Sequence, residues 1–478
     1  MMHAHYDQGI VGQFTPLFDE RSSRGPSDEF ASHAHLLERE QFDSDCWGPR
    51  FMVLVGLVWG AGLAIGFQAA LAILVALGFG AAIVGLFRPV IGLFGIGMLC
   101  TVDAMMRAYL LTGGLLRWNT FNYWLLIVMV IAIPLILRAN DRQTGWLIGF
   151  VLLLCLELFE TPGVEAGVFH ILSVVTVLGM RVYFTRASLD GRAIYWLGMI
   201  TGTVSAAGGL LFFLQRHGLP RIDENAFSYF PLTGLFGICL AFPIAVREQR
   251  GVKLLGALAF ITSCWVMLIG SRGGILVGLS CLLYLVLMIP GRSQRFALAS
   301  AAILVLVGVT SQFAEMREHS LERVGNLFDS ERSAARRTSG RSDLALGAWM
   351  IFCENPMGVG TGGFAKNWAR ISVEKSQVFS GYKRGKEQTC HSAWMKTFAE
   401  NGVPGFLLLG GYVLSFAAAG WRDHRREMCL LGILTSVCLA QAFVSTEFAG
   451  KGLWLLAAGA TEILNGDLAI LRDSENYV

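Results

Sequence analysis

The first residue whose type and position could support chemistry is Arg272. It lies in a Gly-Ser-Arg-Gly-Gly sequence (270–274) between two long apolar segments. Because almost no polar loop surrounds it, we expect its charge at or just below a membrane surface, where charged side chains are costly and usually functional. A planar guanidinium group suits bidentate binding of a phosphate, and the flanking glycines let a ligand approach the backbone. The alternative interpretation is an arginine that only reaches toward the lipid headgroups.

Three further arginines gather in an Arg-Arg-Thr-Ser-Gly-Arg sequence, at Arg336, Arg337 and Arg341. The residues that follow predict an amphipathic helix, because Leu344 and Ala348 share one helical face. Arginines beside the exposed amide groups of a helix N-terminus make an anion-binding site. A solvated basic patch against anionic lipid is an equally good interpretation.

A histidine that could act as a base, His391, begins the segment 391–405, whose spacing predicts a helix with His391 in the first turn and Trp394 on the same face. Lys396 and Glu400 are spaced i,i+4 on another face. An Asn-Gly pair and a proline near the end of the segment are helix-stop signals. An imidazole titrates near neutral pH and suits general-base chemistry, although a lone histidine on an apolar face is more often structural.

Cofactor and metal motifs are not expected. Gly358, Gly360 and Gly363 match the spacing Gly-x-Gly-x-x-Gly, but no strand precedes them, so they predict a glycine-rich turn and not a dinucleotide site. The sequence has no Cys-x-x-Cys pair, and its single Asp-x-Asp sequence, at 43–45, precedes the first apolar segment and lies far along the chain from these candidate residues. A disulfide between Cys353 and Cys390 is a hypothesis that the sequence leaves open.

The elements that must position these residues are membrane helices. Of 478 residues, 54% are hydrophobic and only 15% are charged, and the mean hydropathy is +0.55, whereas a soluble protein carries roughly 25% charged residues. We therefore predict an all-α polytopic membrane protein with about 14 spans (12–14), each needing ~20 apolar residues. The expected spans are 51–67, 70–87, 89–106, 121–137, 144–160, 163–184, 192–214, 229–247, 252–270, 274–290, 296–312, 403–420, 428–445 and 450–464.

Lysines and arginines in alternate short loops indicate which loops are cytoplasmic. They place both termini in the cytoplasm. The expected organisation is a cytoplasmic tail (1–50), a membrane bundle (51–312), one large extracytoplasmic loop with catalytic residues (313–402), C-terminal membrane helices (403–464) and a second cytoplasmic tail (465–478). Trp, Phe and Gly residues in the large loop favour an ordered cap.

Taken together, these segments resemble the O-antigen ligase and O-antigen polymerase superfamily of bacterial membrane glycosyltransferases. The resemblance runs from about Gly251 to Leu464. It rests on the Gly-Ser-Arg-Gly-Gly span end, the large loop before the last spans, the Glu-Asn-Pro and Gly-Val-Gly sequences at 354–360, and the sequence 391–405. This chain departs from the family by a serine after the histidine, where an asparagine often stands, and by a span count above the usual dozen.

The resemblance implies a GT-C-like enzyme of the bacterial inner membrane, independent of metal and nucleotide sugar. Such an enzyme transfers a glycan from an undecaprenyl-diphosphate carrier to an acceptor hydroxyl at the extracytoplasmic face. The resemblance also implies that Arg272 and Arg341 hold the diphosphate and that His391 is catalytic, with Arg336, Arg337, Lys396 and Trp394 as candidate substrate-binding residues. Besides the lipid-linked glycan, the acceptor and membrane lipid, chain-length regulators and other polysaccharide-assembly proteins are candidate partners; no nucleic acid is expected. Polymerase and ligase activity both stay open, with polymerase or exopolysaccharide assembly favoured.

A flippase for lipid-linked oligosaccharides is the main alternative, because such proteins also have about fourteen helices. Flippases, however, have short loops and place cationic residues along a central cavity. The large loop and the scarcity of charge in the middle of the spans favour the transferase.

Overall fold

A computed structural model describes residues 26–109, 141–158, 164–187, 191–214, 224–269, 271–289, 291, 295, 340–379, 384–423, 425–445 and 451–465. Regular structure in these residues is entirely helical, which confirms the predicted all-α class. The helices are α1 (Pro26–Ile65), α2 (Phe67–Val84), α3 (Pro89–Tyr109), α6 (Arg142–Leu158), α7 (Val164–Ala187), α8 (Gly191–Leu214), α9 (Glu224–Glu248), α10 (Val252–Ile269), α11 (Arg272–Met288), α15 (Arg341–Glu354), α16 (Phe364–Glu374), α17 (Ala393–Asp423), α18 (Arg426–Ser445) and α19 (Lys451–Asn465).

Twelve of the predicted spans coincide with described helices, and the predicted spans 121–137 and 296–312 lie outside the described residues. Five described helices are long and apolar enough to cross a membrane, and four more apolar helices are shorter. The protein is therefore a helical membrane protein, as its composition predicts.

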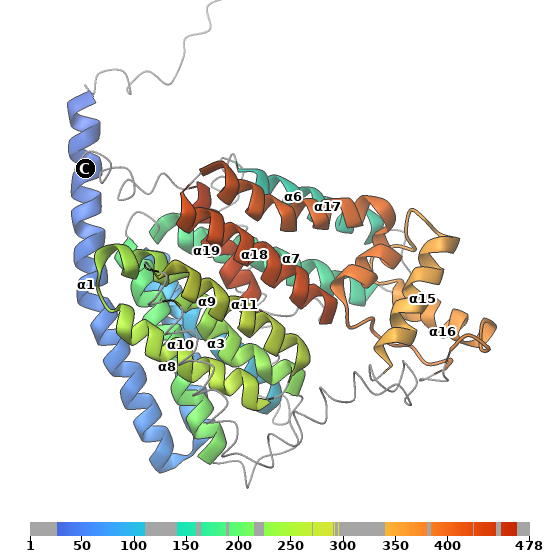
Figure 1. Ribbon diagram of the computed structural model, residues 1–478, viewed down its shortest axis with the longest axis horizontal. Helices are drawn as coiled ribbons and strands as arrows, with labels where there is room; N and C mark the ends of the chain where they lie inside the picture. Colours follow the sequence, from blue (N-terminus) through green and yellow to red (C-terminus); the bar gives the residue numbers. More distant parts are fainter. Residues whose placement is uncertain are drawn as a thin grey trace, which may run out of the picture.

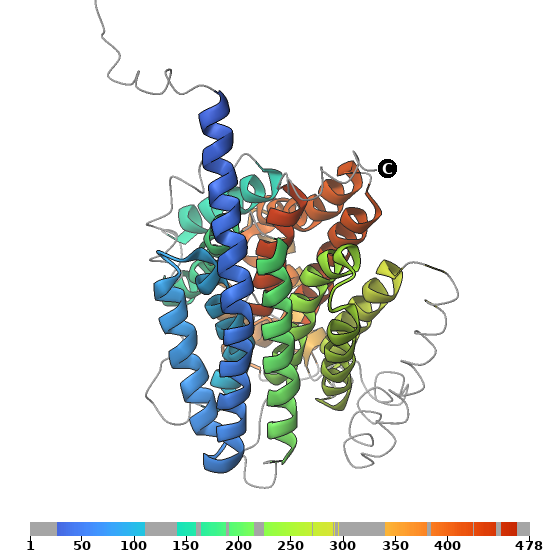
Figure 2. The ribbon, with the colours of Figure 1, turned by 90° about the vertical axis from the view of Figure 1, so that its left-hand side faces the viewer.

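The first helix extends well beyond the bundle. In Figures 1 and 2 the N-terminal half of α1 projects past the other helices, while its C-terminal half packs beside α2 and α8. Pro49 lies inside α1, so the predicted boundary between tail and first span, at residue 50, falls within one continuous helix.

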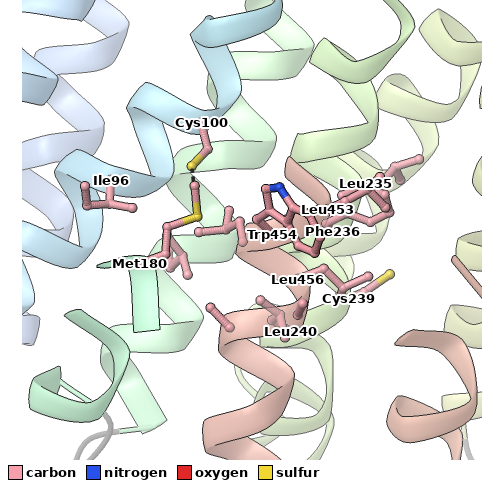
Figure 3. Close-up of a cluster of buried hydrophobic side chains, with 14 of the residues drawn as sticks. Ile96, Cys100, Met180, Leu235, Phe236, Cys239, Leu240, Leu453, Trp454 and Leu456 are labelled. Atoms are coloured by element: carbon pink, nitrogen blue, oxygen red, sulfur yellow. Dashed lines mark hydrogen bonds between the residues drawn. The ribbon is translucent and has the colours of Figure 1, made fainter. Parts of the chain in front are cut away.

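The centre of the bundle is α19. Every residue of α19 from Lys451 to Leu464 is buried, and the helix contacts α3, α7, α9, α17 and α18. Figure 3 shows Trp454 of α19 among apolar side chains of the neighbouring helices, close to a contact between Cys100 of α3 and Met180 of α7. The last predicted span is thus the core of the molecule and not a peripheral helix.

Small residues let α8 and α9 approach closely. A Cβ atom at Gly237 of α9 would lie 2.0 Å from the Thr201 hydroxyl of α8, and one at Gly198 would lie 2.4 Å from the Ala241 side chain. Small residues at such crossings are how membrane helices gain close contact, because lipid is as apolar as the side chains.

A buried ion cluster closes the end of the bundle where α7 and α19 finish. Arg181 pairs with Asp141 at 2.5 Å and with Glu462 at 2.6 Å, and Thr185 donates to Glu462 at 2.9 Å. Charges removed from water need partners of this kind. These pairs join α7, α19 and the residue before α6 at the end of the bundle away from α15 and α16.

Candidate active site

The residues between α11 and α17 include a small helical cap, defined as residues 340–379 and 384–392. The cap contains α15 and α16 and lies at one end of α17, outside the bundle (Figure 1). It has its own apolar core, made of Leu344, Ala348, Ile351, Phe364, Trp368, Ile371, Phe379, Cys390 and Ala399. The helical stripe predicted for 344–351 is confirmed, since its members are buried in this core.

The cap is joined to α17 where that helix is broken. Gly402 has the non-helical angles φ 60° and ψ −151°, and Pro404 has no N–H to donate. The carbonyls of Ala399 and Glu400 therefore lose their helical partners. Two cap amides replace them: Val359 N donates to Ala399 O at 3.1 Å, and Gly360 N donates to Glu400 O at 2.9 Å.

The exchange is reciprocal, because Val403 N donates to Pro356 O at 3.1 Å. Close approach of the two backbones requires glycine on both sides. A Cβ atom at Gly358 (φ 97°) would lie 2.2 Å from Glu400 O, and one at Gly402 would lie 2.3 Å from Pro356 O. The glycine-rich sequence is thus a turn, as expected, and it docks on the helix break, which the sequence did not predict.

Side chains at the break continue into the bundle. Glu400 is 1% exposed; its Oε1 accepts from Phe364 N at 3.2 Å, and its Oε2 lies 3.5 Å from Nδ1 of His170 on α7. A carboxylate buried this deeply is tolerated only with hydrogen bonds and an opposite charge nearby. Lys396, one turn earlier, supplies further positive charge to Glu400.

Asn401 extends the buried network to α6. Its amide donates to Glu157 and, at 2.9 Å, to the Thr361 hydroxyl, which in turn donates to Glu157 at 3.3 Å. The turn, the broken helix, α6 and α7 are therefore held by one polar network. It fixes the cap relative to the bundle.

His391 lies two residues before α17, not in its first turn, because the helix begins at Ala393. The predicted placement is wrong for a local reason: His391 adopts φ 52°, in the left-handed region. Among described non-glycine residues only Gln249 shares a positive φ. Such strained positions are concentrated at functional sites, and the His391 side chain is exposed.

Ser392 anchors the residue that follows the strained histidine. Its hydroxyl donates to Phe443 O of α18 at 3.0 Å and accepts from Met395 N at 3.4 Å, which caps the start of α17. Trp394 is bound to the same helix, since its indole N–H donates to Ala440 O at 3.0 Å. The serine that departs from the family pattern thus positions the histidine backbone against α18.

Arg272 lies at the same end of the bundle. It is the first residue of α11, after Ser271, which caps that helix. Helices α11 and α18 are antiparallel: Ser280 pairs with Gln441 at 3.1 Å, and Leu287 accepts from Arg426. The start of α11 therefore lies beside the end of α18 to which Ser392 and Trp394 are hydrogen-bonded.

Arg341 belongs to the cap. It is half-buried and begins α15, after Gly340 in the left-handed conformation (φ 81°). No described residue forms an ion pair with it. Leu344, one turn later, and Cys390, next to His391, are members of the same cap core. Arg336 and Arg337 lie outside the described residues.

One comparison identifies the segment that carries this site. Residues 257–410 match a family model described as O-antigen ligase. This segment is similar to the O-antigen ligase family, which confirms the resemblance seen in the sequence. All seven candidate site residues lie inside the matched segment.

The match supports a glycan ligase or polymerase type of activity, with lipid-linked glycan and membrane lipid as the substrate class. It gives no support to a flippase. A search among curated proteins found no match.

The sequence did not by itself indicate the buried partners of the site. His170 and Glu400 are separated by 230 residues, and nothing in the sequence around His170 signals the contact. Glu157 follows an apolar run, and a carboxylate at the end of a predicted span does not by itself indicate a functional site. No disulfide joins Cys353 and Cys390 in the described part of the chain; Cys353 is exposed and Cys390 is buried.

Proposed function

We propose that the protein transfers or polymerises a glycan from an undecaprenyl-diphosphate-linked donor onto an acceptor hydroxyl at the periplasmic face of the inner membrane. His391 acts as the general base, and Arg272 and Arg341 bind the diphosphate. One observation carries the proposal: the segment that matches the O-antigen ligase family is the one in which the strained His391 and the start of α11 lie at the same end of the bundle.

The chemistry follows from the residue types. The imidazole of His391 accepts the proton of the acceptor hydroxyl, whose oxygen attacks the anomeric carbon of the donor. The bond from that carbon to the diphosphate oxygen breaks, and the lipid diphosphate leaves with the bonding electrons. Fixed arginines stabilise the negative charge that develops on the leaving group, so the proposal requires no metal ion.

The remaining candidates have supporting roles in this proposal. Arg336 and Arg337 precede α15 in sequence and would add positive charge for the donor. Lys396 is half-buried beside Glu400 and would contact the glycan. Trp394 is held between Phe406 and Phe443, which leaves only part of its ring for a sugar.

A deletion strain tests the proposal through two products, long polymer and glycan joined to its lipid anchor. Loss of polymer with normal attachment would mean a polymerase, and loss of attachment with normal polymer would mean a ligase. Normal amounts of both products, in a strain without a second enzyme of this family, would refute the proposed function.

A further inference from the structure

Helix α15 is apolar on two opposite faces. Its buried face belongs to the cap core, whereas Leu346 is 37% exposed and Trp349 is 49% exposed on the other face. No charged residue lies between Asp343 and Glu354. A helix that is apolar all round needs an apolar environment on both sides, and an exposed patch of this kind marks a contact surface.

The exposed face is continuous with α17 through aromatic stacking. The ring of Trp349 stacks on Phe398, with centroids 5.6 Å apart and planes 11° apart. Phe398 meets Phe406 edge to face, with centroids 5.2 Å apart. We call Trp349, Phe398 and Phe406 the aromatic ridge. It crosses from the cap to the part of α17 beyond the helix break.

The ridge ends on a stripe that faces lipid. Helix α17 is long and apolar enough to cross a membrane, and Val403, Leu407 and Leu414 are 43%, 61% and 67% exposed. Exposed apolar side chains on a membrane-crossing helix have lipid as their solvent. Since Phe406 is 40% exposed among them, the aromatic ridge continues the lipid-facing surface of α17 onto the cap.

The other cap helix has the opposite character. Arg370 of α16 is exposed and pairs with Glu354 at 2.8 Å and with Glu374 at 2.9 Å. The hydrogen bond to Glu354 is the main cause that raises the pKa of Arg370. In Figure 1, α16 lies beyond α15 on the side away from the bundle. The cap therefore has a charged outer helix and an apolar inner one.

We propose that the exposed face of α15 and the aromatic ridge lie in the lipid interface of the leaflet on the cap side, with the Trp349 ring at headgroup depth. Tryptophan concentrates at that depth because its ring is apolar and its N–H is polar, and apolar helix faces insert at the headgroup boundary. The inserted helix holds Arg341, its first residue, at the level of lipid phosphates. The proposal does not depend on transferase activity.

An environment-sensitive fluorophore on Cys353, which is exposed on α15, tests the depth. The full-length protein is reconstituted in vesicles of phosphatidylethanolamine and phosphatidylglycerol that carry nitroxide-labelled lipid. The matched control has the fluorophore on Glu374→Cys of α16, in a Cys353→Ser background. Cys353→Ser alone measures labelling of the other cysteines.

We expect blue-shifted emission at residue 353 and several-fold stronger quenching by the nitroxide lipids than at residue 374. Equal, water-like emission at both sites would overturn the proposal. So would a blue shift without lipid quenching but with energy transfer between labelled copies that rises with protein density, because a second copy would then cover α15.

A substitution pair separates insertion from folding. Trp349→Leu should retain quenching of the Cys353 fluorophore, whereas Trp349→Glu should reduce it by half or more, because a carboxylate resists the interface. Thermal unfolding in detergent shows that both variants are folded. Unchanged quenching in a folded Trp349→Glu variant would contradict the proposed depth.

Discussion

At the residue scale, Arg341 is a half-buried cation on the cap with no described ion-pair partner. We expect Arg341→Lys to lower polymer or ligation product by about ten-fold or more, because a point charge replaces a bidentate fork. Product from cells that make equal amounts of protein is the measurement. Arg370→Lys, at an exposed ion pair of the same cap, is the matched control and should retain normal product. Equal activity of the two variants would contradict the phosphate-binding role.

The Glu400–His170 contact is also tested residue by residue. Glu400→Ala should lower the free energy of unfolding on the order of 1–3 kcal/mol, because it leaves buried donors without an acceptor. Thermal unfolding of the single and double variants with His170→Leu forms a double-mutant cycle. Strict additivity of the two effects would show that the pair makes no energetic contact.

At the element scale, the break in α17 is the feature on which the cap depends. Gly402→Ala places a Cβ atom 2.3 Å from Pro356 O at a positive φ, in a backbone region almost restricted to glycine (ψ −151°), which costs about 1–3 kcal/mol for the conformation alone. We expect a lower unfolding temperature and faster proteolysis of the cap. Gly410→Ala, on the same helix with open space around it, should change neither. A Gly402→Ala variant as stable as Gly410→Ala would contradict the docking of the turn on the break.

How far the sequence predicts these elements depends on how local each signal is. The stop signals at 401–404 mark where α17 is interrupted, and the glycine spacing marks a turn. Neither signal shows that the two segments exchange hydrogen bonds, because that contact joins residues 40 positions apart. The left-handed conformation of His391 could not be predicted either, because helical periodicity carries no information about the backbone of a single residue.

At the scale of the whole molecule, composition is sufficient to predict a helical membrane protein, because an apolar chain must satisfy its backbone internally in lipid. The central place of α19 was not predicted, because helices buried by protein and helices surrounded by lipid are both apolar. The structure shows that the cap lies at one end of the bundle, because α17 begins beside the cap at Ala393 and ends at Asp423 at the opposite end of the bundle.

The orientation in the membrane is a prediction for the whole molecule. A cysteine replacing Lys375, exposed on the cap, should react with a membrane-impermeant maleimide in intact spheroplasts. A cysteine replacing Arg422, exposed near the other end of α17, should react only after permeabilisation. Both belong in a Cys353→Ser background. The reverse pattern would place the cap in the cytoplasm and refute the proposed periplasmic site.

The most direct measurement is transfer by the purified protein, reconstituted with an undecaprenyl-diphosphate-linked glycan and an acceptor glycan or lipid, in the presence of a metal chelator. We expect release of undecaprenyl diphosphate with matching gain of the glycosidic product. His391→Ala should lower the rate roughly 10²–10⁴-fold and Arg272→Ala roughly 10²–10³-fold, both in folded protein. Transfer at the normal rate by either variant, or transfer that requires an added divalent metal, would contradict the account.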